Sequence, residues 1–235
     1  MARIIFITGT DTGVGKTVLT ALLARSLRQR GLRVAALKPI SSGGRSDAFV
    51  LYRAVDEELT LDEINPWHFH AALAPLLAAR HERRVARKAQ VVAHIRQVAT
   101  RFAVVLVEGA GGLLSPLGEK FDCRDLIAAL RAVPLILTAN RLGAVNQVRL
   151  VLEALPATAA RHAQVLLVNQ LLPDPAAPSN AELLARFVQK DRIHVFPKLR
   201  PEESDGSRPL HAAARRVLGR IEACLLGKRL SRSPS

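Results

Sequence analysis

A glycine-rich loop near the N-terminus carries most of the chemistry that this sequence can do. Residues 4–17 read IIFITGTDTGVGKT, an apolar and largely β-branched run that leads into glycines and closes with Gly15, Lys16 and Thr17. The residues that follow have helical periodicity. A strand, a glycine loop, a lysine, a hydroxyl residue and a helix form the layout of a phosphate-binding P-loop. We therefore interpret the segment as a nucleotide site rather than as a plain glycine turn.

Each part of this loop has a physical role. Glycines let backbone N–H groups turn toward phosphate oxygens, and the start of the helix adds the positive end of its dipole. Lys16 would place its charge on the outer phosphates, and Thr17 would offer a hydroxyl to Mg²⁺. The loop is one residue longer than the standard pattern, because its first glycine is Gly9. Asp11 stands where partition and nitrogenase-reductase ATPases carry a second lysine.

A lysine and a glutamate end two other strand-like runs. Lys38 follows the run 32–37, and a lysine at the carboxyl end of a parallel strand points into the ligand crevice. The alternative is a surface lysine before a turn. Glu108 follows the apolar run 102–107, which is the shape of a Walker B element and suits an Mg²⁺ site.

Other polar positions are weaker when taken alone. Ser46 or Asp47 could cap a helix, and Asp47 becomes a metal ligand only in company with the other motifs. Gly143 opens a helix whose first N–H groups could hold a carboxylate or could form a simple turn. Asn169 and Pro197 follow strand-like runs, where an adenine pocket would form.

Apolar runs alternate with helical stretches along the chain. The strand-like runs are 3–8, 32–37, 102–107, 134–139, 164–168 and 192–196, and the helix-like stretches are 17–30, 89–101, 144–155, 179–190 and 209–226. This alternation is typical of a mostly parallel sheet covered by helices on both faces. We expect a doubly wound α/β fold of the P-loop NTPase type as one domain over residues 1–226. The stretch 171–178 should be a loop, and 227–235 a disordered basic tail.

Composition narrows the class of protein. The chain has 235 residues, of which 49% are hydrophobic, enough for one substantial core. It shows neither a charge-free stretch of membrane-spanning length nor a signal peptide, so a cytoplasmic protein is expected. Cys123 and Cys224 have no metal or redox spacing and should be free thiols.

The net charge of +14 favours anionic partners. Much of the excess lies within residues 80–101 and after residue 198, without the interleaved aromatic residues of single-strand binders. A solvated basic face is therefore expected, not a specific nucleic-acid site.

Taken together, the motifs resemble those of the dethiobiotin synthetase family. The matching strings are GTDTGVGKT, KPISSG, SDA, NPWHF, APLLAA, VEGAGGLLSPL and LGAVNQ, in the family's order. The resemblance implies a homodimeric cyclo-ligase that depends on ATP and Mg²⁺. It would convert 7,8-diaminononanoate, CO₂ and ATP to dethiobiotin, ADP and phosphate through a carbamate and a carbamic–phosphoric anhydride.

The resemblance also implies residue roles, position by position. The catalytic residues would be Lys16, Lys38 and Thr12. ATP would be bound by Gly13, Val14, Gly15, Lys16, Thr17, Val18, Asn169, Pro197 and Leu199. The diamine would be bound by Thr12, Lys38 and Ser42 and, across the dimer interface, by Gly143, Ala144, Val145 and Asn146. The Mg²⁺ ion would be surrounded by Thr17, Asp47 and Glu108.

The sequence departs from the family pattern in places, and two rival functions stay open. Gly13 stands where some members carry glutamate, and residues 71–75 lack an acid–proline pair, which leaves the substrate-side loop 66–82 unassigned. One rival is a ParA-like ATPase that binds DNA nonspecifically, which the net charge favours and Asp11 disfavours. The other is an amidoligase of the cobyrinate diamide synthase type. It would normally need a glutaminase domain, and no cysteine-bearing glutaminase motif is present.

Overall fold

A single parallel sheet of six strands organises the protein. The computed structural model describes residues 2–227, so the tail predicted at 227–235 lies outside the described residues apart from Gly227. The strand order is β2-β5-β1-β6-β7-β8, and every neighbouring pair is parallel. The strands are β1 (Arg3–Gly9), β2 (Val34–Leu37), β5 (Val104–Glu108), β6 (Val133–Ala139), β7 (Gln164–Val168) and β8 (Ile193–Phe196). Each of the six predicted strands is found, with its ends within two residues of the prediction.

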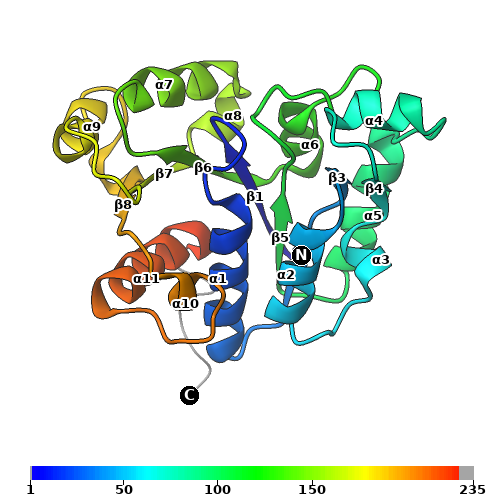
Figure 1. Cartoon of the computed structure of the whole chain (residues 1–235), viewed down its shortest axis with the longest axis horizontal. Coiled ribbons are helices and arrows are strands. Elements are labelled where there is room, and N and C mark those ends of the chain that lie inside the picture. The colour runs from blue at the N-terminus through cyan, green and yellow to red at the C-terminus, as the bar shows by residue number, and fades with distance from the viewer. Residues whose placement is uncertain (1, 228–235) are drawn as a thin grey trace.

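Helices cover both faces of this sheet (Figure 1). One face carries α1 (Lys16–Gln29), α2 (Ser46–Ala54) and α11 (Ala212–Leu226). The other carries α5 (Lys88–Ala99), α6 (Cys123–Leu130) and α7 (Ala144–Ala154). Shorter elements are α3 (Leu61–Ile64), α4 (Pro75–His81), α8 (Ala157–Ala160), α9 (Ala177–Leu184), the 3₁₀ turn η1 (Lys190–Arg192) and α10 (Pro201–Ser204). The prediction of a doubly wound α/β fold is confirmed.

The buried core explains why the strands could be predicted from the sequence. Residues 5–7 of β1 and the whole of β5 are buried, because helices cover both sides of these central strands. Such strands are apolar without alternation. Phe6, Leu23, Ile95 and Leu106 are among the largest fully buried side chains, and alanine, leucine and valine fill most of the remaining core. No helix in the described part of the chain is long and apolar enough to cross a membrane.

Several short elements were not predicted. β3 (Ile40–Ser42) and β4 (Trp67–Phe69) form a separate two-stranded parallel sheet, and three residues are too few to show a period. The helix predicted at 179–190 begins earlier and ends earlier, as α9. The predicted loop 171–178 is therefore wrong at its last two residues, where Pro178 occupies a first-turn position that suits proline.

Candidate functional site

The candidate site lies along the carboxyl edge of the sheet. In a parallel sheet all strands end at the same edge, and ligands bind there. Glu108 is the last residue of β5 and lies in register with Ile7 of β1, just before the P-loop. Lys38 follows β2, which pairs with β5 on the other side. Asn169 follows β7, next to β8. The sheet thus aligns the polar residues that the sequence singled out.

The P-loop links β1 to the N-terminus of α1. A Cβ atom on Gly9 would lie 2.7 Å from a methyl carbon of Val14, so any other residue there would have to displace Val14. Gly15 caps the helix with a φ of 93°, a left-handed conformation that favours glycine. Nζ of Lys16 donates to the carbonyl oxygen of Asp11 at 2.7 Å. Burial lowers the pKa of Lys16, and the positive charge of Lys38 adds to this effect.

Lys38 stands between two carboxylates. Its Nζ lies 2.6 Å from Oε1 of Glu108 and 2.8 Å from Oδ2 of Asp47. The hydroxyl of Thr17 donates to the same Glu108 oxygen at 2.7 Å. Side chains from α1, α2 and the ends of β2 and β5 therefore meet in one cluster, defined here as the Lys38 cluster: Thr17, Lys38, Asp47 and Glu108.

The charges in the Lys38 cluster stabilise one another. Burial alone would lower the pKa of Lys38, but the negative charges of Glu108 and Asp47 outweigh it and raise the pKa. Burial likewise opposes ionisation of Asp47, and Lys38 reverses this effect, so that the pKa of Asp47 falls. The helix-cap alternative is wrong. The N-cap residue of α2 is Arg45, so Ser46 and Asp47 are the first two residues of the helix and neither caps it. The carboxylate of Asp47 contacts Lys38 instead.

The residues of the Lys38 cluster fit Mg²⁺. Oε2 of Glu108 is buried and has no hydrogen-bond partner among the described residues, which is costly unless a cation or donor approaches it. Hydroxyl and carboxylate oxygens are the donors that Mg²⁺ takes. Residues 2–227 hold no group of three or more histidine, cysteine, aspartate or glutamate residues suited to a metal. An ion here would complete its shell with water and phosphate oxygens, as Mg²⁺ usually does.

Two cavities flank the P-loop. The first, of about 660 Å³, is lined by Thr12, Lys16, Thr17, Lys38, Ser42, Asp47 and Glu108 among others. The second, of about 350 Å³, is lined by Val14, Asn169, Pro197 and Leu199 among others. Gly13, Gly15 and Val18 line both cavities. The predicted reaction residues and the predicted adenine residues thus belong to adjoining spaces.

One predicted group lies outside both cavities. Gly143 is the N-cap of α7, with a φ of 89°, and Ala144, Val145 and Asn146 form the first turn. N–H groups in a first helical turn have no carbonyl partner within the helix, so they can bind an anion. None of the four lines either cavity of its own chain. The structure does not bring them to Lys38 or Ser42.

The substrate-side loop 66–82 is attached beside Lys38. It contains β4 and α4, and its middle part is joined to the end of β3 by two bonds. The hydroxyl of Ser42 donates to the carbonyl of Leu73 at 2.6 Å, and the Gly43 N–H donates to the carbonyl of Ala71 at 3.1 Å. Leu73, Ala74 and Pro75 consequently line the larger cavity.

Some residues of the site escaped the sequence analysis. Ser115 lines the larger cavity, and its hydroxyl accepts the N–H of Gly112 at 2.9 Å, which shapes the loop after Glu108. Ser115 lies within the family string VEGAGGLLSPL, and this position could have marked it as a site residue. Asn140 donates to Oδ1 of Asn169 at 2.8 Å, and Asn180 donates to Oδ1 of Asn140 at 2.9 Å. No local pattern marks this amide chain, because Asn180 comes from α9.

Comparisons with known proteins identify the family of this chain. A family model described as "AAA domain" matches residues 3–222. The ATP-dependent dethiobiotin synthetase BioD of Anaeromyxobacter dehalogenans (strain 2CP-1) is 42% identical over 201 residues, which cover 83% of this chain and 90% of that protein. The chain belongs to the ATP-dependent dethiobiotin synthetase family. The member from Bacillus licheniformis is 33% identical over 201 residues, which cover 83% and 85% of the two chains. The predicted family is confirmed, and with it an ATP-dependent ligase that forms C–N bonds.

Solved structures with little sequence identity show the same fold. The septum site-determining protein MinD of Pyrococcus horikoshii, complexed with Mg-ADP, has a TM-score of 0.61 and 16% identity, with full coverage of both chains. A ParA family ATPase of Chlorobium tepidum has a TM-score of 0.60 and 13% identity, covering 93% of this chain and 98% of that one. These likenesses confirm the P-loop NTPase fold of a dethiobiotin synthetase family member and do not bear on its chemistry.

Proposed function

We propose that this chain is a dethiobiotin synthetase that closes a ureido ring on 7,8-diaminononanoate with CO₂ and ATP, releasing ADP and phosphate. The observation that carries the proposal is the pair of lysines, Lys16 and Lys38, that line one cavity with a hydroxyl and two carboxylates beside a P-loop. The carbamate, the mixed anhydride and the phosphate groups of this reaction are all anionic, so positioned positive charge is what it needs most.

The steps follow from where the charges lie. One substrate amine adds to CO₂ and loses a proton, which gives a carbamate held by Lys38 in the cavity that Thr12 and Ser42 also line. A carbamate oxygen then attacks the γ-phosphorus of ATP, and the β–γ bond breaks while Lys16 neutralises the transferring group. The second amine attacks the carbonyl carbon of the resulting anhydride. The ring closes, phosphate leaves and the amine loses its proton.

The Lys38 cluster would also hold the metal. Thr17, Asp47 and Glu108 would bind Mg²⁺, which supplies charge neutralisation for the phosphates. Lys38 already contacts the carboxylates of Asp47 and Glu108, which hold its ammonium group at the wall of the larger cavity.

The smaller cavity would take the adenine. Its walls include Val14 of the P-loop, Pro197 and Leu199, which offer apolar contact to a flat base. Oδ1 of Asn169 is already occupied by Asn140, which leaves the Asn169 NH₂ group as the hydrogen-bond donor for a ring nitrogen.

We further propose a homodimer in which Gly143, Ala144, Val145 and Asn146 serve the partner's cavity. Their position outside the cavities of their own chain supports this arrangement. Exposed apolar side chains also gather on α7, α9 and the loops beside them, as expected for a contact surface. They are Leu142, Leu150, Leu171, Leu172, Leu183 and Phe187. The enzyme would work in the cytoplasm on small molecules, without a specific nucleic acid or a membrane.

Phosphate release tests this function. With ATP and Mg²⁺, the purified chain should release phosphate only when 7,8-diaminononanoate and bicarbonate are both present. Release that ignores the diamine would overturn the proposal.

The net charge of +14 favours one rival, a DNA-binding ATPase. Fluorescence anisotropy with labelled duplex DNA separates the two. For the ligase, attraction to DNA should vanish at ~150 mM salt, where the Debye length is about 8 Å. Submicromolar binding at that salt, with ATP hydrolysis stimulated by DNA and indifferent to the diamine, would favour the rival.

A further inference from the structure

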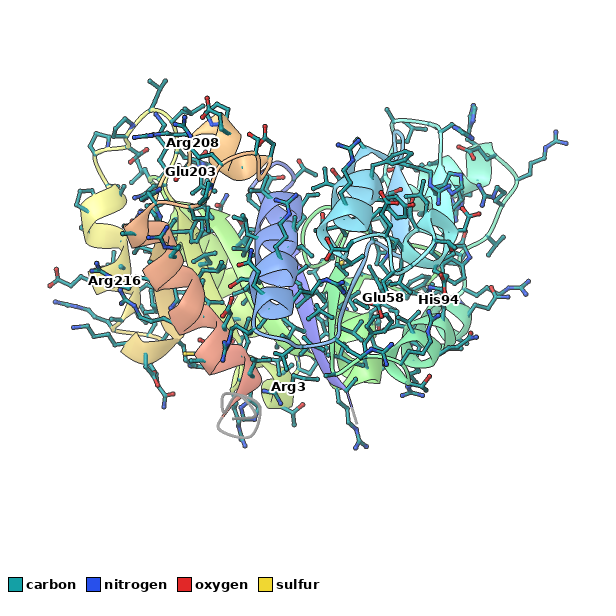
Figure 2. The ribbon with its side chains drawn as sticks, turned by 90° about the horizontal axis from the view of Figure 1, so that it is seen from below. Arg3, Glu58, His94, Glu203, Arg208 and Arg216 are labelled. Carbon is teal, nitrogen blue, oxygen red and sulfur yellow. The ribbon has the colours of Figure 1, made fainter. Side chains whose placement is uncertain are left out.

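A buried carboxylate lies behind the smaller cavity and has no part in the chemistry above. Glu203 belongs to α10, in the segment that joins β8 to α11, and its side chain is 4% exposed. Its neighbours Pro201 and Ser204 line the cavity assigned to the base, whereas Glu203 lines a different cavity on the far side, between α1 and α11. Figure 2 labels Glu203 and Arg208 close together in this segment.

Glu203 joins the two ends of the segment. Its Oε2 accepts the backbone N–H of Arg200 at 2.9 Å. Its Oε1 accepts the backbone N–H of His211 at 2.6 Å and lies 2.8 Å from Nδ1 of the same histidine. Arg200 is the N-cap of α10 and His211 is the N-cap of α11. One carboxylate therefore holds both ends of the residues 200–211.

Other hydrogen bonds in this segment are local, such as those from the Arg208 N–H to the Glu202 carbonyl and from the Ser207 N–H to Oδ1 of Asp205, both 2.8 Å long, whereas those of Glu203 join its two ends. α10 is only four residues long, and the following residues 205–210 form neither helix nor strand. Hydrogen bonds from N–H donors to an ionised carboxylate are stronger than those to a neutral acceptor. The backbone N–H of Arg200, helped by His211, lowers the pKa of Glu203 to about 2, so the carboxylate is charged at neutral pH.

A second attachment ties the segment to the P-loop helix. Nη2 of Arg25, on α1, donates to the carbonyl oxygen of Asp205 at 3.2 Å. The guanidinium group also lies against Gly206, where an added Cβ would come within 2.0 Å of Nη1. Since α1 begins at Lys16, the base wall and the phosphate loop are held to one helix.

We propose that Glu203 is a positioning residue for nucleotide binding, which fixes the wall of the base cavity formed by Pro197, Leu199, Pro201 and Ser204 without touching the ligand. The proposal rests on the assignment of that cavity to adenine. Removing the charge should loosen the wall and weaken contacts to the base. Contacts of the phosphates with the P-loop should stay as they are, because Lys16 and Thr17 do not depend on residues 200–211.

The test compares a ligand that has a base with one that lacks it. In Glu203→Gln, the dissociation constant of a nonhydrolysable ATP analogue should rise about tenfold, while that of inorganic tripolyphosphate stays within twofold. The matched control is Glu202→Gln, the same change at the exposed neighbouring residue, which should alter neither constant. His211→Ala keeps the backbone N–H. It should also raise the dissociation constant of the ATP analogue, by a smaller factor.

The outcomes are distinct. The proposal would be overturned if Glu203→Gln raised the dissociation constants of the ATP analogue and of tripolyphosphate equally, or raised neither. If Glu203→Gln does not fold, His211→Ala decides by the same comparison. In turnover, the KM for ATP should rise while kcat and the KM for the diamine stay within twofold. The binding assay needs no diamine, so a failure of the proposed reaction would appear separately, as wild-type protein that binds nucleotide but releases no phosphate.

Discussion

The ammonium group of Lys38 lies 2.6 Å from Oε1 of Glu108, and both side chains are almost completely buried, at 6% and 1% exposed. The other oxygen of Glu108 has no hydrogen-bond partner among the described residues. A buried ion pair left incomplete in this way contributes little to stability, because desolvation offsets the attraction. We interpret the pair as a device for binding charge rather than for holding the fold together.

The first prediction concerns the stability of this pair. Lys38→Met should lower the free energy of unfolding by roughly 3 kcal/mol, because it leaves Glu108 buried without its main counter-charge. The double variant Lys38→Met/Glu108→Gln should be less destabilised than the sum of the single changes, as measured by urea unfolding.

The exposed pair Arg80–Glu119, with an Nη2–Oε1 distance of 2.7 Å, provides the matched control. Arg80→Met and Glu119→Gln should each lower the free energy of unfolding by less than about 1 kcal/mol. If the losses of unfolding free energy in Lys38→Met and Glu108→Gln simply add up in the double variant, the two residues are not coupled.

The second prediction concerns the metal. Glu108→Gln and Asp47→Asn should each shift the Mg²⁺ dependence of phosphate release to higher concentration, since each removes a charged oxygen donor. Direct Mn²⁺ binding, followed by electron paramagnetic resonance, should weaken in parallel. Glu119→Gln, a surface change, should leave both measurements unaltered. Identical Mg²⁺ titrations in wild type and both variants would exclude a metal role.

The third prediction concerns acid stability through His194. Its ring lies on β8, 3.0 Å from Oε1 of Gln164, and burial lowers its pKa from 6.5 to about 4, with help from the charge of Arg220. Asp191 opposes this shift. Because the unfolded chain binds the proton more readily, stability should be full above pH 6.5 and fall as the pH drops toward 4, with a loss of roughly 2 kcal/mol between pH 7 and pH 5.

Chemical unfolding at pH 7 and pH 5 measures this effect. His194→Gln should flatten the loss over that interval, since glutamine does not titrate. An equal loss in the variant and the wild type would assign the acid sensitivity to other groups.

The sequence predicted well those parts that depend on local pattern. Strands buried on both faces read as continuous apolar runs, and their carboxyl ends locate Lys38, Glu108, Asn169 and Pro197 along one edge. The P-loop was readable because its glycines, lysine and threonine are consecutive. The structure brings Thr17, Asp47 and Glu108 together around Lys38, and their metal role stays a prediction.

The parts that sequence analysis missed depend on tertiary contacts. Glu203 sits in a short helix without periodicity, and its bond to His211 spans a loop that no local pattern describes. β3 and β4 pair across two intervening helices, α2 and α3. The sequence allowed a cap at Ser46 or Asp47, and neither forms because α2 already begins at Ser46, with Arg45 as its N-cap, while Asp47 contacts Lys38.

If this chain takes the ureido carbon of its product from CO₂ at the Lys16–Lys38 cavity, isotope labelling should follow that carbon into the product. The chain is incubated with 7,8-diaminononanoate, Mg-ATP and ¹³C-bicarbonate, and products are analysed by mass spectrometry alongside phosphate release. We expect dethiobiotin that carries a single ¹³C, formed in equal amount with phosphate, and none with Lys16→Ala. Phosphate released without labelled product, or labelled product from Lys16→Ala at a rate within about threefold of wild type, would contradict it.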